Sequence, residues 1–219
     1  MTDRRALVGL AVLLALGLVT VPLLAPSRAA DEETRPLAVA DFEKVRMEAA
    51  FTTDITAGAS HTRVTASGAP AQLDRITTRI DGDTLVIGMH SGTSFFERSP
   101  KITIAVPTLY AFENDGTGRT TIRSLTGVDF KLENSGTGSI VASGHARRER
   151  VTLNGTGNID TTAVDARDVT VDNNGVGSIS VRASGKLTLS VNGVGSIRYT
   201  GNPTSVQSSV NGIGHIGRL

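Results

Sequence analysis

Four aspartates in one short stretch are the residues whose type and spacing best suit chemistry. Asp160, Asp165, Asp168 and Asp172 lie close together, with Arg167 among them. Carboxylates bind Ca²⁺ when a preorganised loop gathers about six to eight oxygens, and a facing pair can hydrolyse a glycosidic bond. These aspartates are spread over two expected strands and a corner. We therefore predict a solvated surface and no metal site, and we keep a polysaccharide lyase or hydrolase using the Asp160–Asp172 face as the alternative.

The motif Gly-x-Gly, which occurs six times, is the second pattern that could do chemistry. A nucleotide-binding loop also needs a following helix whose N-terminus holds the phosphate, and no helical pattern follows these motifs. Tandem copies instead predict structural turns and no cofactor. The glycine pairs are Gly116 and Gly118, Gly136 and Gly138, Gly155 and Gly157, Gly175 and Gly177, Gly193 and Gly195, and Gly212 and Gly214.

Other reactive residue types are scattered or absent from the sequence. The chain has no cysteine, which excludes a disulfide framework, a thiolate metal site and a cysteine nucleophile. The four histidines, which lie in separate segments without ligand spacing, are His61, His90, His145 and His215. We predict no catalytic residues and no metal ligands.

Two short segments are candidates for contact with a partner. The first, Arg147-Arg148-Glu149-Arg150, is a basic corner that is either solvated or a contact for an anionic surface polymer. The second, Phe95-Phe96, either packs over the fold or forms an exposed patch that binds a partner or lipid. Without residues 1–29 the chain carries a net charge of about −1, so no global field favours nucleic acid.

The Gly-x-Gly motifs recur at intervals of 20, 19, 20, 18 and 19 residues. Alternating apolar and polar residues precede each motif, which is typical of strands with one buried face. A single unit cannot bury its apolar side, but stacked units bury a continuous column. We predict a β-solenoid with an isoleucine column, and an amide ladder of the asparagines before the glycines. The column is Ile140, Ile159, Ile179, Ile197 and Ile216, with Ile122 two places late in the first unit.

The remaining chain divides into three further segments. Residues 1–29 are predicted to be a signal peptide, with an uncleaved membrane anchor as the alternative. Residues 30–40 are predicted to be a polar tether. Residues 41–107 contain strand patterns without the glycine motif and without a helical stripe, and form either an irregular first half of the solenoid or a small capping β-domain. Residues 108–219 are the repeat solenoid.

The order of these features resembles the bacterial family named putative auto-transporter adhesin head, or GIN, domain. The resemblance covers about residues 41–219. It rests on Phe42-Glu43-Lys44-Val45, residues 81–87 (DGDTLVI), residues 101–107 (KITIAVP), the Gly-x-Gly units and residues 199–203 (YTGNP). It implies a right-handed β-helix-like fold and an exported bacterial location, but no established activity. Family members often have serine where this chain has asparagine before the glycines, a change that affects the ladder but not the fold.

These observations predict an exported protein of the periplasm or cell surface that is not an enzyme. We expect an adhesin-like binding module or a structural module whose partner is a cell-envelope polymer or a surface protein. We expect no nucleic-acid partner, and contact with a membrane only through an uncleaved N-terminal segment. The exposed strand edges at the ends of a solenoid also offer a surface for self-association.

Overall fold

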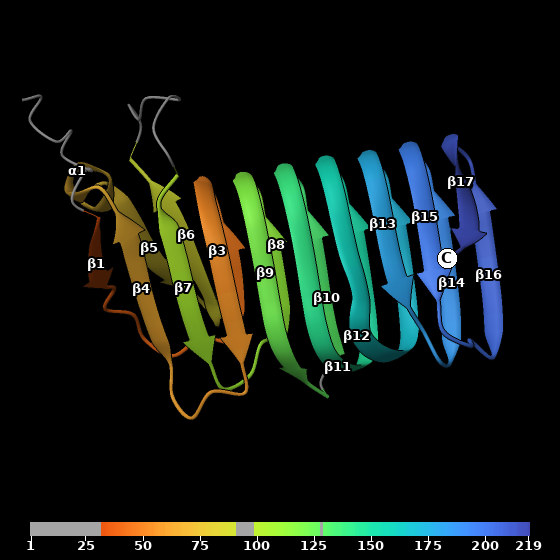
Figure 1. Cartoon of the computed structure of the whole chain (residues 1–219), viewed down its shortest axis with the longest axis horizontal. Helices are drawn as coiled ribbons and strands as arrows, with labels where there is room; N and C mark the ends of the chain where they lie inside the picture. The colour runs from red at the N-terminus through yellow and green to blue at the C-terminus, as the bar shows by residue number, and fades with distance from the viewer. Residues whose placement is uncertain (1–31, 91–98, 128) are drawn as a thin grey trace, which may run out of the picture.

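The fold is a nearly all-β solenoid, seen in a computed structural model that describes residues 32–90, 99–127 and 129–219. Its coils stack side by side along the longest axis of the molecule (Figure 1). The predicted leader and Phe95-Phe96 lie outside the described residues. Within those residues, no helix has the length and apolar character required to cross a bilayer.

The repeat half forms a solenoid of about 5 turns, which confirms the predicted fold class. Each coil contributes one segment to each of two opposed parallel sheets, and the long strands β11 and β12 bend from one sheet to the other. We call the sheet of β8, β10, the second halves of β11 and β12, β14 and β16 face A. Face B contains β9, the first halves of β11 and β12, β13, β15 and β17. The bounds are β8 Ala111–Asn114, β9 Thr117–Thr126, β10 Asp129–Asn134, β11 Thr137–Leu153, β12 Thr156–Asn173, β13 Val176–Arg182, β14 Lys186–Val191, β15 Val194–Thr200, β16 Ser205–Val210 and β17 Ile213–Arg218.

The predicted isoleucine column is confirmed by the strand register of face B. Ile140, Ile159, Ile179, Ile197 and Ile216 are direct neighbours in successive strands. Ile122, which is two places late in the sequence, pairs instead with Ala142 and with Ile55. The isoleucine column therefore begins at Ile140, whose partner in β9 is Thr120, and Ile122 belongs to a separate row with Ile55 and Ala142.

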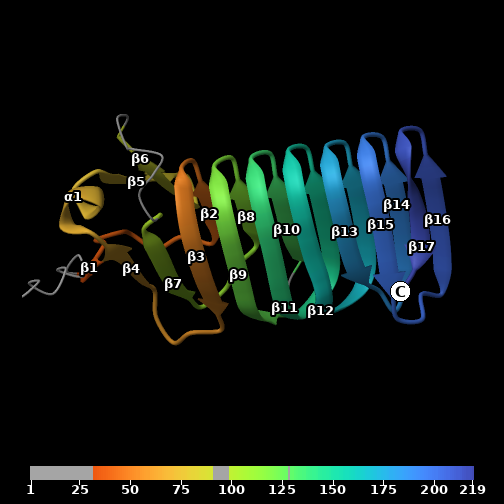
Figure 2. The same ribbon diagram turned by 45° about the horizontal axis from the view of Figure 1, so that its top comes forward.

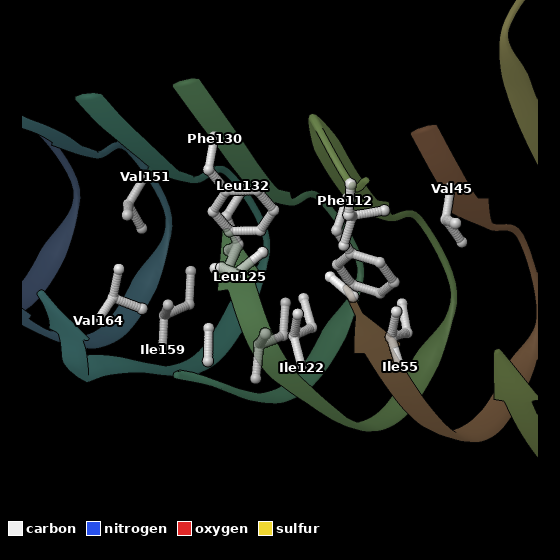
Figure 3. Packing of buried hydrophobic residues seen from close by; sticks show 14 of the residues in the cluster. Val45, Ile55, Phe112, Ile122, Leu125, Phe130, Leu132, Val151, Ile159 and Val164 are labelled. Carbon is white, nitrogen blue, oxygen red and sulfur yellow. The ribbon is translucent and has the colours of Figure 1, made fainter. Parts of the chain in front are cut away.

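The core lies between the two faces and runs the length of the solenoid (Figure 3). Phe112 and Phe130 point inward from face A, toward residues of face B such as Ile122 and Leu125 (Figure 3). All four side chains are almost fully buried. Burial of this apolar side is the main force that holds each coil on the next, at roughly 25 cal/mol per Å².

The first half also forms coils, but their order in space differs from their order in the chain. The coil of β2 and β3 lies between the coil of β6 and β7 and that of β8 and β9. The chain thus adds β6 and β7 on one side of β2 and β3, and then continues on the other side (Figure 2). The bounds are β2 Lys44–Met47, β3 Ala50–Ala57, β6 Thr84–Met89 and β7 Lys101–Val106.

Antiparallel elements cover the N-terminal end of the solenoid. β5 (Ile76–Asp81) pairs with β6, β4 (Arg63–Gly68) pairs with β7, and β1 (Glu33–Pro36) pairs with β4. The short helix α1 (Pro70–Leu73), which the sequence pattern did not predict, lies at the same end (Figure 2). The structure also differs from the predicted tether, because β1 continues the sheet. Arg35 of β1 forms an ion pair with Glu33 in the same strand and another with Asp74, the residue after α1, and the second contact holds β1 against this end of the solenoid.

The Gly-x-Gly motifs lie at the corner where face A turns into face B. A Cβ atom added to Gly175 would lie 2.0 Å from the carbonyl oxygen of Gly155 in the preceding coil. Gly177 has a φ of +149°, a backbone conformation that residues with a side chain rarely adopt. The predicted amide ladder is confirmed beside this corner: Asn174 donates to Asn154 (3.0 Å), Asn192 to Asn174 (2.9 Å) and Asn211 to Asn192 (3.1 Å).

Candidate binding groove

The structure separates the four aspartates of the predicted Asp160–Asp172 face. Asp160 lies on face B, Asp165 in the bend of β12, and Asp168 and Asp172 on face A. The idea that these aspartates share one face was therefore wrong, because β12 bends between the two sheets within this stretch. Among the described residues, no group of three or more His, Cys, Asp or Glu side chains could hold a metal ion.

All four of these carboxylates have intramolecular partners, and those of Asp165 are His145 and Arg182, at 3.8 and 3.9 Å. Asp160 accepts hydrogen bonds from the backbone N–H (3.0 Å) and the hydroxyl (2.7 Å) of Thr162. Asp168 accepts from the backbone N–H of Lys186 at 2.9 Å. Asp172 forms an ion pair with Arg150 at 2.9 Å. The contacts of Asp168 and Asp172 join adjacent coils, whereas those of Asp160 stay within β12.

Three residues of the basic segment, Arg148, Glu149 and Arg150, instead line a groove on face A, and Arg147 lies beside it. It has a volume of about 340 Å³ and is bounded by β10, β11, β12 and the residue before β8. Register explains its composition, because Arg148 pairs with Asp129 on one side and with Asp168 on the other. Three adjacent coils thus present charges of alternating sign across the groove. The lining residues are Tyr110, Asp129, Phe130, Lys131, Arg148, Glu149, Arg150, Asp168 and Thr170.

Two guanidinium groups share one carboxylate at the edge of this groove. Arg147 contacts Asp129 at 3.1 Å, and Arg148 contacts the other carboxylate oxygen. The hydrogen bonds from Arg148 and then Arg147 lower the pKa of Asp129. The three groups together leave one positive charge, and the two arginine side chains are more than 60% exposed. An incoming anion can therefore reach both arginines.

Tyr110 and Lys131 form the other side of the groove. The backbone carbonyl of Tyr110 accepts a hydrogen bond from the N–H of Lys131 at 2.9 Å, which fixes its position relative to β10. Its ring is partly exposed. The Lys131 ammonium contacts Glu113 at 3.1 Å and Glu133 at 2.9 Å. An aromatic ring beside charged groups on a rigid sheet can pack against the apolar C–H face of a sugar while the charged groups contact its polar substituents.

Glu149 belongs to the same segment but points into the core. It lies between Phe130 and Val169 in the face A register and is 2% exposed. The described residues offer neither carboxylate oxygen a hydrogen bond of good geometry. Burial raises the pKa of Glu149 to about 8, and the Thr161 hydroxyl offsets this only partly. Glu149 is therefore protonated near neutral pH and is not a ligand-binding group.

A second cleft, of about 600 Å³, lies at the corner of the first half. It contains His61, whose ring nitrogen Nδ1 is 2.8 Å from the hydroxyl of Ser60, and Asp83, which is paired with Lys44 at 2.9 Å. The other histidines do not gather there. His145 is 3.8 Å from Asp165, and His215 lies in β17.

Sequence reasoning singled out the arginines of the groove but missed Tyr110 and Asp129. Asp129 lies one repeat before Arg148, so aligning the units by their glycines would have placed the two side by side. The same alignment puts Glu149 on the inward parity with Phe130 and Val169. Tyr110 carried no such signal, because its position depends on the crossing from β7 to β8.

Together these features define a class of protein: a β-solenoid with one covered end and a charged groove on one face. The model of the family described as putative auto-transporter adhesin, head GIN domain, matches residues 41–203. The chain belongs to this family, as the resemblance implied. A comparison with curated protein sequences finds no match.

Two solved structures illustrate the similarity. A protein from Bacteroides fragilis described as a putative adhesin is 26% identical, with a TM-score of 0.71 over 89% of this chain and 99% of its own. A protein from Parabacteroides distasonis described as a putative lipid binding protein is 18% identical, with a TM-score of 0.51 over 87% of this chain and 98% of its own. The second likeness concerns the fold alone.

Proposed function

We propose that the protein is an exported, non-enzymatic binding module of the cell envelope, and that its face A groove holds an anionic polymer. Membership of an adhesin-like family and the signal-like leader support the exported location. The observation that carries the choice of ligand is the Arg147–Arg148–Asp129 cluster, which has one net positive charge and two exposed guanidinium groups. Guanidinium groups bind carboxylates and sulfates through paired hydrogen bonds.

The geometry of the solenoid favours an extended ligand. Adjacent strands lie about 4.8 Å apart, so a polymer crossing face A meets a new row of side chains in every coil. Along one line across the coils, each coil contributes one outward side chain: Lys131, Arg150, Thr170 and Thr188 are successive neighbours. A chain of sugars with carboxylate or sulfate groups could contact several coils at once, and its binding would weaken as salt screens the charges.

The separation of the aspartates supports a non-enzymatic role. Hydrolysis of a glycoside needs two carboxyl groups facing the scissile bond. Of the four aspartates between residues 160 and 172, only Asp168 and Asp172 lie on face A, where Asp168 is held by the backbone of Lys186 and Asp172 by the guanidinium of Arg150.

The test is binding of the purified full chain to a panel of acidic and neutral envelope glycans, with reducing-end release measured in the same wells. We expect retention of acidic glycans without release. The double variant Arg147→Ala, Arg148→Ala should weaken this binding at least about tenfold, because it removes two charge-assisted contacts.

Arg182→Ala provides the matched control. Arg182 is similarly exposed, at 52%, and contacts Asp165 at 3.9 Å, but it lies outside the groove. The control should bind like the wild type. An equal loss of glycan binding in both variants would show that the glycan binds outside the groove. Release of reducing ends would show that the protein is an enzyme.

A further inference from the structure

The C-terminal end of the solenoid differs from every internal coil, because its last two strands have a neighbour on one side only. Among the described residues β16 pairs only with β14, and β17 only with β15. Val206 and Val210 are 43% and 46% exposed, although Leu187 and Val191, their partners in the preceding coil, are fully buried. The core is thus open at this end, and a row of backbone hydrogen-bonding groups is unpaired.

We propose that this end binds a second copy of the same chain, with β16 of one copy pairing antiparallel to β16 of the other. The pairing would join two solenoids into one and close both open cores. The proposal concerns assembly, and it does not depend on what the face A groove binds.

The sequence of β16 complements itself. In an antiparallel pair centred on Ser208, Val206 lies opposite Val210 of the second copy, and Gln207 lies opposite Ser209. Val206, Ser208 and Val210 all have the inward parity of this face, so the pairing adds two valine pairs to the core, with the two small Ser208 side chains opposite each other between them. β16 also contains no charged residue, and therefore no like charges meet.

β16 lacks the features that usually block an edge strand. Natural edges are protected by lysine, proline, bulges or a covering element, and the six residues of β16 include none of these. The opposite end of the solenoid is covered by β1, β4 and β5, where Arg35 and Arg79 form ion pairs. One open and one covered end favour a closed pair over a filament, as expected for a two-fold interface.

A single cysteine tests the pairing directly, because the chain has none of its own. In an antiparallel sheet, directly opposed residues have Cα atoms about 4.5 to 5.5 Å apart, which lies within the range for a disulfide. Ser208→Cys lies at the centre of the pair, so mild oxidation of the full chain should give a nearly complete covalent dimer. Ser205→Cys is the matched control on the same strand. Its two copies would be about 20 Å apart along the strands and should not crosslink.

Charge provides the second test, with every variant checked for folding by circular dichroism. Ser208→Lys places two positive charges opposite each other on the core-facing side of the pair and should raise the dimer dissociation constant at least about tenfold in sedimentation equilibrium. Thr188→Lys adds the same charge to the outer surface of β14, one coil inside, and should leave the constant unchanged. Dimerisation with a Ser208→Cys crosslink and this difference between the lysine variants would support the proposal. A folded chain that stays monomeric, or a dimer that Ser208→Cys does not crosslink, would overturn it.

Discussion

The two halves of the solenoid find their strand partners in different ways. In the repeat half, each residue pairs with the residue about one unit away, as Ile140 does with Ile159. In the first half, Lys44 pairs with Thr84 on one side and with Ala111 on the other. The repeat half is therefore built from local contacts, whereas the coil of β2 and β3 is complete only when β8 and β9 are in place. Long-range pairing of this kind closes larger loops and slows folding.

The halves also differ in what their cores contain. Among the described residues, the buried side-chain atoms without a hydrogen-bond partner all belong to the repeat half: they are in Asn134, Glu149, Thr161 and Asn173. Regular stacking of the backbone evidently holds the repeat half together despite these polar groups. Substitutions that disturb the stacking should therefore matter more there than changes to a side chain at the surface.

Among single substitutions compared between the two halves, the corner glycines offer the largest difference in stability. Gly175→Ala would place Cβ 2.0 Å from the Gly155 carbonyl oxygen, so the neighbouring coil has to move. Gly82→Ala, in the first half, adds a Cβ with no atom within 4 Å and only the strain of a φ of +62°. We expect a loss of unfolding free energy of about 3 kcal/mol or more for Gly175→Ala and about 1 kcal/mol for Gly82→Ala. Urea denaturation followed by circular dichroism measures both, and equal losses would contradict the role of coil stacking.

Glu149 should make stability depend on pH in the direction opposite to an ordinary paired carboxylate. Its folded pKa is about 8, against 4.5 for the unfolded chain. Between these values the unfolded state releases the proton and the folded state keeps it. Stability should therefore fall as pH rises from 4.5 to 8, by roughly 4 to 5 kcal/mol in all. Glu149→Gln should remove this slope in denaturation measured at several pH values.

Glu113, which links the two halves, provides the contrast. Burial alone would raise its pKa, but the hydrogen bonds from Arg46 and Lys131 outweigh burial, and the pKa of Glu113 is lowered. Its contribution is present above the unfolded pKa and is lost as the solution becomes more acidic. Glu113→Gln should therefore weaken the dependence of unfolding free energy on pH only at acidic pH. If the stability of Glu149→Gln depended on pH between 4.5 and 8 in the same way as that of the wild type, Glu149 would be ionised in the folded protein and the prediction would be wrong.

Periodicity explains which parts of this structure could be predicted. The glycine spacing predicted the repeat coils, the isoleucine column and the asparagine ladder, because in a solenoid each residue meets its own equivalent. Strands of the first half were also predicted from alternation. Their order in space was not predicted, since nothing in the sequence shows that β2 lies between β6 and β8, and β3 between β7 and β9. Predicting the charge cluster at Asp129 would have required the strand register. Predicting that Asp160 and Asp168 lie on different faces would have required knowing that β12 bends between them.

The smallest expected losses of stability come from removing two surface contacts, one in each half. Asn192 donates to Asn174 and accepts from Asn211, so Asn192→Ala breaks the amide ladder and should cost about 1 kcal/mol. Arg79 in the first half forms an exposed ion pair with Glu48, and Arg79→Ala should cost less. The two effects differ in their response to salt. Because salt screens exposed charges, the loss for Arg79→Ala should vanish in denaturation at high ionic strength. The loss for Asn192→Ala should persist, since the ladder joins neutral amides, and a loss that salt also removed would show that the ladder contributes nothing of its own.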